Sequence, residues 1–226
     1  MRKKINLFAS FSLIGVLAFS LAPSVSAEES TPTVPETTNG TQLARLVDGQ
    51  WEAVDAAPLD LHNAPAPEGE MSPQLISFDQ WFRCFSLNES SEVFSTYEFP
   101  KDGVGYPITL QCGNDVYGYK HIRAGKETQW QQKIDAGLAA GWNPDMQAVE
   151  SWDDLMNMAT ASFVSDPGEG LKYSAVSQKY CTNGIMGFVN AQFEPVYQFR
   201  VTVSWSENNA RIITSYPDPR TYCNAN

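Results

Sequence analysis

Histidine is scarce in this chain of 226 residues, which contains only His62 and His121. Basic side chains are also few, with 15 Lys and Arg against 26 Asp and Glu. So large an acidic excess disfavours binding to polyanions. The excess is uneven, because residues 28–115 carry 3 basic and 15 acidic side chains whereas residues 116–226 carry 9 and 11. The objection to a nucleic-acid ligand therefore applies mainly to the first half.

Beyond residue 21 the sequence has no apolar run long enough to span a membrane. The run at residues 7–21 follows three cations and precedes Val25, Ser26 and Ala27, which is the pattern of a secretory signal peptide. We expect residues 1–27 to be removed by cleavage near Ala27. The mature protein is then expected to be secreted, extracellular and soluble, with no membrane contact.

Cysteine occurs only four times, at Cys84, Cys112, Cys181 and Cys223. An even number in an exported protein predicts two disulfides. Three pairings are possible, and one of them joins Cys181 to Cys223 and leaves Cys84 and Cys112 as a local pair. The cysteines are isolated and neither histidine lies at ligand spacing from them, so a metal site is disfavoured and no cofactor is expected.

Residues 28–74 are predicted to be an acidic, proline-rich linker, because Thr, Pro and Glu dominate its start and residues 63–69 read Asn-Ala-Pro-Ala-Pro-Glu-Gly. One folded domain is predicted over residues 75–226. A sharper hypothesis gives residues 42–61 a function, in which their carboxylates cover a basic face of the domain until a partner is met.

Three segments, at residues 78–85, 126–140 and 152–163, have apolar residues at the spacing of a helix face. Ser151 and Asp154 stand where a capping box would begin the third helix. We expect the apolar faces to pack into a core. Their residues are Phe78, Trp81, Phe82 and Phe85, then Trp130, Ile134 and Leu138, then Trp152, Leu155, Met156, Ala159 and Phe163.

After residue 166 the apolar period changes to two, which is the period of a strand. The fold class predicted is α+β, with helices packed on one face of a four-stranded antiparallel meander and an acidic, partly disordered N-terminal extension. A further short strand is expected at residues 106–112. The segments predicted to form the meander are residues 171–181, 185–193, 196–205 and 210–216.

The last two strands predict a polar outer face. If Trp205 faces Ala210 across the hairpin loop, one face is apolar and the other is cationic and rich in hydroxyls. Such a face could hold a phosphate by charge-assisted hydrogen bonds, or it could simply be the solvated side of the sheet. One bulge would exchange the facing of Thr214 and Ser215. The residues predicted on the outer face are Arg200, Thr202, Ser204, Arg211 and Ser215.

Three short motifs and their order carry a resemblance: an entry segment, a pair of helices and a closing strand. Residues 119–122 read Tyr-Lys-His-Ile ahead of the helix pair, and residues 211–217 read Arg-Ile-Ile-Thr-Ser-Tyr-Pro. Over residues 114–219 the chain resembles the metal-independent ribonucleases grouped around barnase, EndoU, the tRNA-cleaving colicins and RelE, which include toxin domains used in bacterial competition. The resemblance implies RNA as the substrate, bound on the open face of a four-stranded sheet, and a cognate immunity protein as partner.

By this resemblance, His121 matches the general base or acid, and Thr214 or Ser215 matches the hydroxyl that contacts the phosphate. Many relatives have a second histidine or an arginine shortly after the first, where this chain has Gly125, Lys126 and Glu127. The sequence therefore departs from the family at the second proton-transfer position.

Cleaving RNA without a metal requires a base for the 2′-hydroxyl, cations for the phosphorane and an acid for the leaving oxygen. An imidazole titrates near about pH 6.5, so His121 can serve one of these roles. Arg200 is predicted to act with it as a catalytic cation. The residues predicted to bind the substrate are Lys120, Arg123, Lys172 and Tyr216.

The competing hypothesis is a non-catalytic exported binding module that holds a protein or a cell-wall polymer on the open sheet. His121 would then be an ordinary surface residue before a helix. A divalent-metal nuclease is disfavoured, because carboxylates and histidines do not cluster at suitable spacing. Replacing His121 with Ala should abolish RNA degradation only if the chain is the enzyme.

Overall fold

The computed structural model describes residues 40–54 and 75–225. The predicted signal peptide and much of the predicted linker, at residues 1–39 and 55–74, lie outside the described residues. Within the described residues, no helix combines the length and the apolar character needed to cross a membrane.

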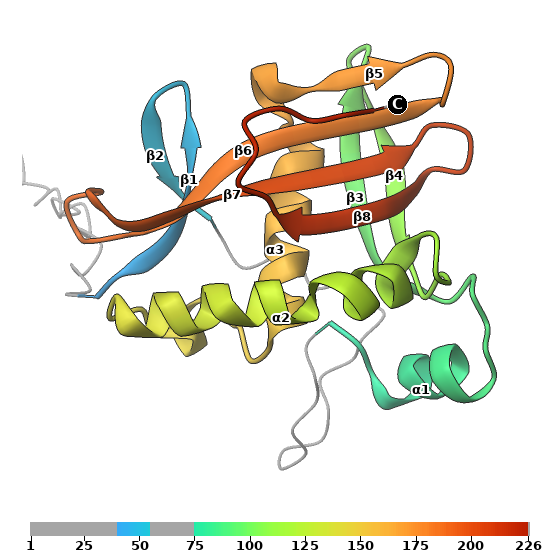
Figure 1. Ribbon diagram of the computed structural model, residues 1–226, viewed down its shortest axis with the longest axis horizontal. Coiled ribbons are helices and arrows are strands. Elements are labelled where there is room, and N and C mark those ends of the chain that lie inside the picture. The colour runs from blue at the N-terminus through green and yellow to red at the C-terminus, as the bar shows by residue number, and fades with distance from the viewer. Residues whose placement is uncertain (1–39, 55–74, 226) are drawn as a thin grey trace, which may run out of the picture. The chain divides into compact units, whose positions relative to one another are not determined.

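The architecture is a curled, mixed sheet of eight strands that bends into a half-barrel (Figure 1). Seven strands follow the order β2-β1-β6-β7-β8-β4-β3, and β5 pairs with β6 beside this path. All neighbours are antiparallel except β4 and β8, which are parallel. The strands are β1 (Gln42–Val47), β2 (Gln50–Ala53), β3 (Val93–Lys101), β4 (Val104–Gln111), β5 (Lys172–Ser174), β6 (Lys179–Val189), β7 (Pro195–Ser206) and β8 (Arg211–Pro217).

The predicted four-stranded meander is therefore wrong. Strands β6, β7 and β8 do form an antiparallel run, but β1 adds to β6 with Leu43 opposite Phe188, and β4 adds to β8. Strand β1 comes from the segment predicted to be linker. The two strands expected around residues 171–193 are instead the short β5 and one long β6, which continues through Gly184. The ring of Phe163 lies where a side chain at Gly184 would be, so this position requires glycine.

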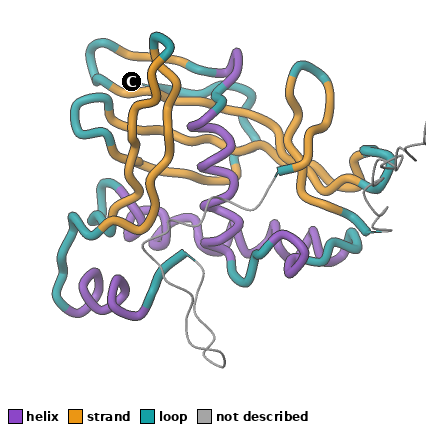
Figure 2. Tube along the Cα trace, turned by 180° about the vertical axis from the view of Figure 1, so that it is seen from behind, coloured by secondary structure: helices purple, strands orange, loops and turns teal. Residues whose placement is uncertain are grey.

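The helices lie on two sides of the curl. Helix α3 crosses the inside of the curl against β3 and β6, and α2 runs beside β8 along the lower margin of the sheet (Figure 1; seen from behind in Figure 2). The helical elements are α1 (Phe78–Trp81), the π-helix η1 (Phe82–Ser86), α2 (Gly118–Ala139), η2 (Pro144–Gln147), α3 (Trp152–Ser165) and η3 (Gly168–Gly170).

Helix α3 matches its prediction closely. Ser151 and Asp154 form the predicted capping box, and the Asp154 carboxylate also accepts a hydrogen bond from Leu75 N at 3.1 Å. Burial raises the pKa of Asp154 above its usual range, although hydrogen bonds from the helix N-terminus oppose the shift. The predicted apolar face of α3 is buried in the core.

Helix α2 begins eight residues before the predicted start, at Gly118. Trp130 is fully buried and donates its indole N–H to Ser215 O at 3.1 Å, as a core position of this helix requires. Leu138, predicted to lie in the core, is 52% exposed. Gly137 takes the inward position instead, because the rings of Phe188 and Trp142 lie where a side chain would be.

The predicted apolar face at residues 78–85 is mostly exposed rather than buried. Phe78 is 73% exposed and Trp81 and Phe82 are each 44% exposed, while Cys84 turns inward and is fully buried. The switch from α1 to the π-helix η1 changes which residues share a side. The Cys84–Cys112 disulfide then anchors this segment to the end of β4.

The prediction of two disulfides is confirmed. Cys84 is bonded to Cys112, and Cys181 to Cys223, with Cα atoms 5.5 and 5.9 Å apart. The second bond ties the segment after β8 back to β6.

Candidate functional site

Ser215, predicted to contact a phosphate, lies inside the core. Its side chain is fully buried, and its hydroxyl accepts a hydrogen bond from Thr160 Oγ1 at 2.9 Å. The cause is a register shift between Ser204 and Trp205, which places Ser215 opposite Val203 on the helix-facing side. The predicted display of Ser215 on the outer face is therefore wrong, and the bulge that the sequence left open decides the facing.

Thr214 takes the outer face in its place, opposite Ser204. Its hydroxyl is shielded from solvent and has no hydrogen-bond partner among the described residues. Arg211, also predicted on this face, lies with its guanidinium 3.6 Å from the centre of the Tyr117 ring. Arg211 Nε, like the Thr214 hydroxyl, is shielded from solvent and has no hydrogen-bond partner among the described residues.

His121 sits in the first turn of α2, half-exposed, with Nδ1 2.8 Å from Asp115 O. Its neighbours are engaged elsewhere, since Lys120 donates to Asn88 at 2.7 Å and Arg123 pairs with Glu127 at 3.3 Å. Lys120 and Arg123 also share the ring of Phe85, whose centre is 5.5 Å from Lys120 Nζ and 5.1 Å from the Arg123 guanidinium carbon.

The predicted catalytic groups are not brought together. Arg200 lines the same cavity as Gln129 of α2. His121, which does not line it, precedes Gln129 by eight residues, which is about 12 Å along a helix. Lys172 lies on β5, opposite Cys181 of β6.

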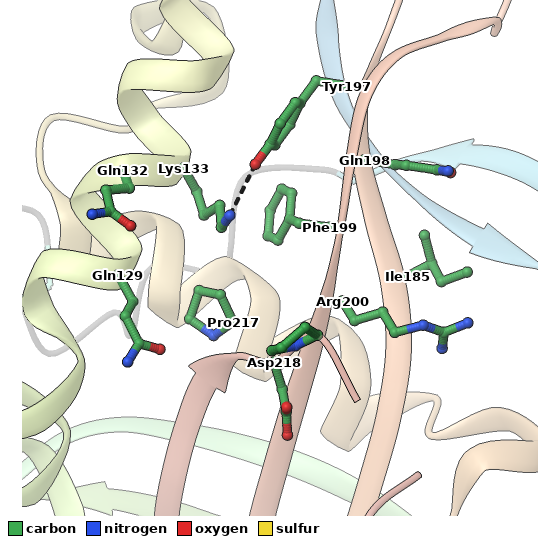
Figure 3. Close-up of a pocket in the computed structure, with 11 residues that line it drawn as sticks. Gln129, Gln132, Lys133, Ile185, Tyr197, Gln198, Phe199, Arg200, Pro217 and Asp218 are labelled. Atoms are coloured by element: carbon green, nitrogen blue, oxygen red, sulfur yellow. Dashed lines mark hydrogen bonds between the residues drawn. The ribbon is translucent and has the colours of Figure 1, made fainter. Parts of the chain in front are cut away.

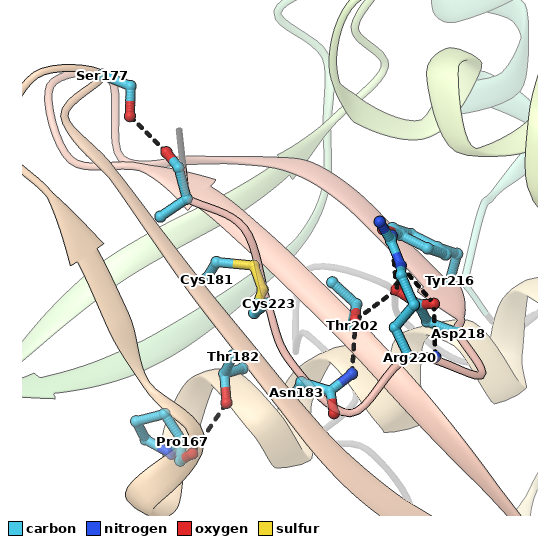
Figure 4. Close-up of a disulfide and its surroundings, with 11 residues drawn as sticks. Pro167, Ser177, Cys181, Thr182, Asn183, Thr202, Tyr216, Asp218, Arg220 and Cys223 are labelled. Carbon is cyan, nitrogen blue, oxygen red and sulfur yellow. Dashed lines mark hydrogen bonds and ion pairs between the residues drawn. A yellow bond between two sulfur atoms is a disulfide. The ribbon is translucent and has the colours of Figure 1, made fainter.

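The outer sheet face that was predicted to be open and polar is covered in the structure. After β8 the chain turns back over the outer face of β6 and β7, and the Cys181–Cys223 bond holds it there (Figure 4). Thr202, only 4% exposed, donates to Asp218 Oδ2 at 3.1 Å and accepts from Asn183 at 2.8 Å. The Thr202 hydroxyl therefore binds groups of the protein itself.

An ion pair completes this covered network. Arg220 donates to the Asp218 carboxylate at 2.8 Å and to the Tyr216 hydroxyl at 2.6 Å. Burial opposes ionisation of Asp218, but the hydrogen bonds from Arg220 and Thr202 outweigh it and lower the pKa of this carboxyl. Burial, with the nearby Asp218 charge, raises the pKa of Tyr216. Tyr216 also carries Lys126 over its ring at 4.5 Å, so it is not free to stack on a base.

An accessible cavity of about 550 Å³ lies where β8 ends and β7 continues (Figure 3). We call it the α2–β7 cleft. Gln129, Gln132 and Lys133 line it from α2, and Gln198 and Arg200 line it from β7. Its volume falls in the range of small-ligand and peptide sites.

Two cations in the α2–β7 cleft have polar but not acidic partners. Lys133 Nζ donates to the Tyr197 hydroxyl at 2.9 Å and lies over the Tyr197 and Phe199 rings. Arg200 donates to the Asn183 amide oxygen at 3.2 Å. In the part of the chain that the structure describes, neither cation forms a salt bridge within 4.0 Å. The third charged residue of the cleft, Asp218, is paired with Arg220, so the two cations remain for a negatively charged group of a ligand.

A larger cavity of about 850 Å³ lies between α3 and the β3–β4 hairpin. Its border includes Val54, the last described residue before residues 55–74. The cation on its wall, Arg45, is already paired with Asp166. Within residues 40–54 and 75–225, no three His, Cys, Asp or Glu side chains come together as a metal site would require.

Sequence reasoning found Arg200 but missed the other polar residues of α2 and β7 that share its cavity, among them Lys133 and Gln198. A signal was present, because the predicted strand at residues 196–205 is longer than its hairpin partner at residues 210–216. A long strand beside a short one leaves an edge uncovered. Comparisons with protein-family models, with curated proteins and with solved structures found no match for this chain.

Proposed function

We propose that this protein is an exported, non-catalytic domain that binds a partner protein in the α2–β7 cleft. The observation that carries the proposal is the pairing of an accessible cavity with two cations that have no acidic partner among the described residues. The two disulfides support export, because such bonds persist in oxidising compartments.

Binding fits the geometry better than RNA transesterification does. That reaction needs a base, a cation and a phosphate-binding hydroxyl around one phosphorus atom. Here His121 is about 12 Å along α2 from the cleft, and Ser215 is buried beneath the helices.

Site-specific crosslinking tests the proposal. A benzoylphenylalanine at Gln132, which lines the cleft, should crosslink to a protein from the surface fraction of the producing cell. The same group at the neighbouring exposed Gln131, which does not line the cleft, is the matched control. We expect an adduct at Gln132 alone that protease degrades and muramidase leaves intact. Equal adducts at both positions, or an adduct that muramidase removes, would contradict a protein ligand in this cleft.

The enzyme alternative is tested in parallel. Oxidised mature protein is incubated with total RNA in EDTA, and the products are analysed for 2′,3′-cyclic phosphate ends. We expect none above the level of the His121→Ala variant. Cyclic phosphate ends that appear with the original protein and vanish with His121→Ala would overturn the non-catalytic proposal.

A further inference from the structure

Strand β7 is longer than the strand that covers it on one side. It pairs with β6 from Ser206 to Pro195, but its register with β8 covers only Ser206 to Val201. A final hydrogen bond joins Asp218 N to Arg200 O at 2.9 Å. The next residue is Pro219, which has no N–H to continue the ladder.

The uncovered part of β7 presents backbone groups to the α2–β7 cleft. Along a strand, the N–H and C=O of alternate residues point to the same edge. Because Arg200 O points toward the β8 side, the N–H and C=O of Gln198 point there too. No strand among the described residues pairs with Gln198 on that edge. An open donor and acceptor of this kind form a template for another strand.

The side chains around this edge alternate between two faces. Figure 3 shows Gln198 and Arg200 on one side of β7, and Tyr197 with Lys133 on the other. A strand placed in line with β8 would therefore direct successive side chains first toward one cation and then toward the other. A carboxylate on either face would meet a cation that has no acidic partner in the described chain.

We propose that the α2–β7 cleft binds a short extended segment of the partner protein as an added β-strand, and that this segment carries an acidic side chain. The inference rests on the proposed binding function and specifies its mode. The open edge runs from Val196 to Phe199, because Arg200 O is already bonded to Asp218 N. It is about 13 Å long and accommodates about four residues. Main-chain hydrogen bonds supply affinity in this mode, and side-chain pockets supply specificity.

Lys133 and Arg200 also explain which kinds of peptide segment should bind weakly. A lysine or arginine beside an open edge disfavours pairing with basic strands, and desolvating it against an apolar strand has a cost that no new bond offsets. An acidic residue satisfies the charge and removes that cost. RNA and glycans lack the alternating amide N–H and C=O groups that Gln198 requires.

The test begins with a phage-displayed library of random linear 12-residue peptides, selected on the oxidised mature protein. We expect enriched peptides to contain Asp or Glu, and a fluorescein-labelled copy of the most enriched one to bind in a fluorescence-anisotropy titration. Replacing its acid with the amide should weaken binding about tenfold, as for a charge-assisted hydrogen bond. Failure of the library to yield any peptide that binds would overturn the proposal.

Methylating the peptide amides one at a time isolates the strand mode. We expect loss of binding at every second residue, because only alternate N–H groups face β7. In the protein, Gln198→Pro removes the edge donor and should weaken binding about tenfold. Gln198→Ala keeps the donor and is its control. The methylation series needs no protein variant, so it decides the question even if Gln198→Pro fails to fold.

Charge variants separate failure of the mode from failure of the site. Arg200→Gln should weaken the peptide about tenfold, whereas Lys172→Gln, an exposed cation on β5, should not change it. Sensitivity to Arg200→Gln without a period of two in the methylation series would overturn strand addition but keep the cleft. Peptides that bind all variants equally, or that an oligoribonucleotide of equal concentration displaces, would overturn both.

Discussion

Two glycines of α2 make a sharp prediction about how this helix sits on the sheet. An added Cβ at Gly137 would lie 2.6 Å from the Phe188 ring and 2.7 Å from the Trp142 ring. Both rings are buried, so neither can swing away freely. Gly125 lies in the same helix, is exposed, and an added Cβ there would meet nothing within 4 Å. The same substitution to Ala should therefore have opposite effects at the two positions.

The magnitudes follow from two terms. Replacing Gly with Ala inside a helix raises the free energy of unfolding by about 1 kcal/mol, because Gly loses more conformational freedom on folding than Ala does. Overpacking a core costs about 1 to 3 kcal/mol, and two close contacts with rigid rings place Gly137 at the upper end. We expect Gly137→Ala to lower the free energy of unfolding by about 2 kcal/mol and Gly125→Ala to raise it by about 1 kcal/mol.

Urea denaturation followed by tryptophan fluorescence, together with calorimetry, measures both changes. For a domain of this size, about 1 kcal/mol corresponds to about 2 to 4 °C in Tm. The Tm should therefore fall by about 4 to 8 °C in Gly137→Ala and rise by about 2 to 4 °C in Gly125→Ala. Stabilisation by both substitutions would refute the packing of α2 on β6, and with it the position of the cleft wall.

Three further variants test the covered face and the core. Ser215→Ala should lower the free energy of unfolding by about 1 kcal/mol, because it removes a buried hydrogen bond, and an unchanged urea midpoint would place this hydroxyl in solvent. Replacing Cys181 and Cys223 together with Ser should lower it by about 4 kcal/mol, since the bond closes a loop with a sequence separation of 42; a loss under about 1 kcal/mol in the same assay would contradict a tail held on the sheet. The pKa of Asp218 is lowered in the folded protein by Arg220 and its other donors, so its stabilisation is present above about pH 4 and is lost as pH falls through the folded-state value. Asp218→Asn should therefore flatten the acid limb of stability measured against pH, and a limb of unchanged slope would count against this ion pair.

Features set by neighbouring residues were predictable from the sequence. The capping box of Ser151 and Asp154, the apolar face of α3 and the β7–β8 hairpin all depend on contacts within a few residues or across one loop. Apolar periodicity indicates which face of such an element is buried. These elements appear in the structure close to their predicted bounds.

The sheet as a whole was not predictable, because its pairings are long-range. Strand β1 pairs with β6 across more than a hundred residues, and β4 joins β8 in parallel. The period of a strand shows which side chains share a face, but it does not name the partner strand. The predicted burial of α1 is wrong for a related reason. The π-helix turns Cys84 inward, and the spacing of Phe78 and Trp81 does not indicate that such a helix follows.

The candidate site was half visible in the sequence. Arg200 was predicted as a cation on a polar face, but no open edge was predicted, although the last two predicted strands differ in length. Ser215 was predicted on the wrong face because one bulge residue reverses the facing. Lys133 and Gln198 line the same cavity only because α2 crosses the end of β8. No local sequence pattern predicts this crossing.

Amide hydrogen exchange at Gln198, followed by NMR in the unliganded protein, tests the open edge most directly. The account predicts that the Gln198 N–H exchanges rapidly, while the N–H groups of Tyr197 and Phe199, which face β6, are protected. Protection of Gln198 equal to that of Phe199 would show that this edge is already paired, and would contradict strand addition in the α2–β7 cleft.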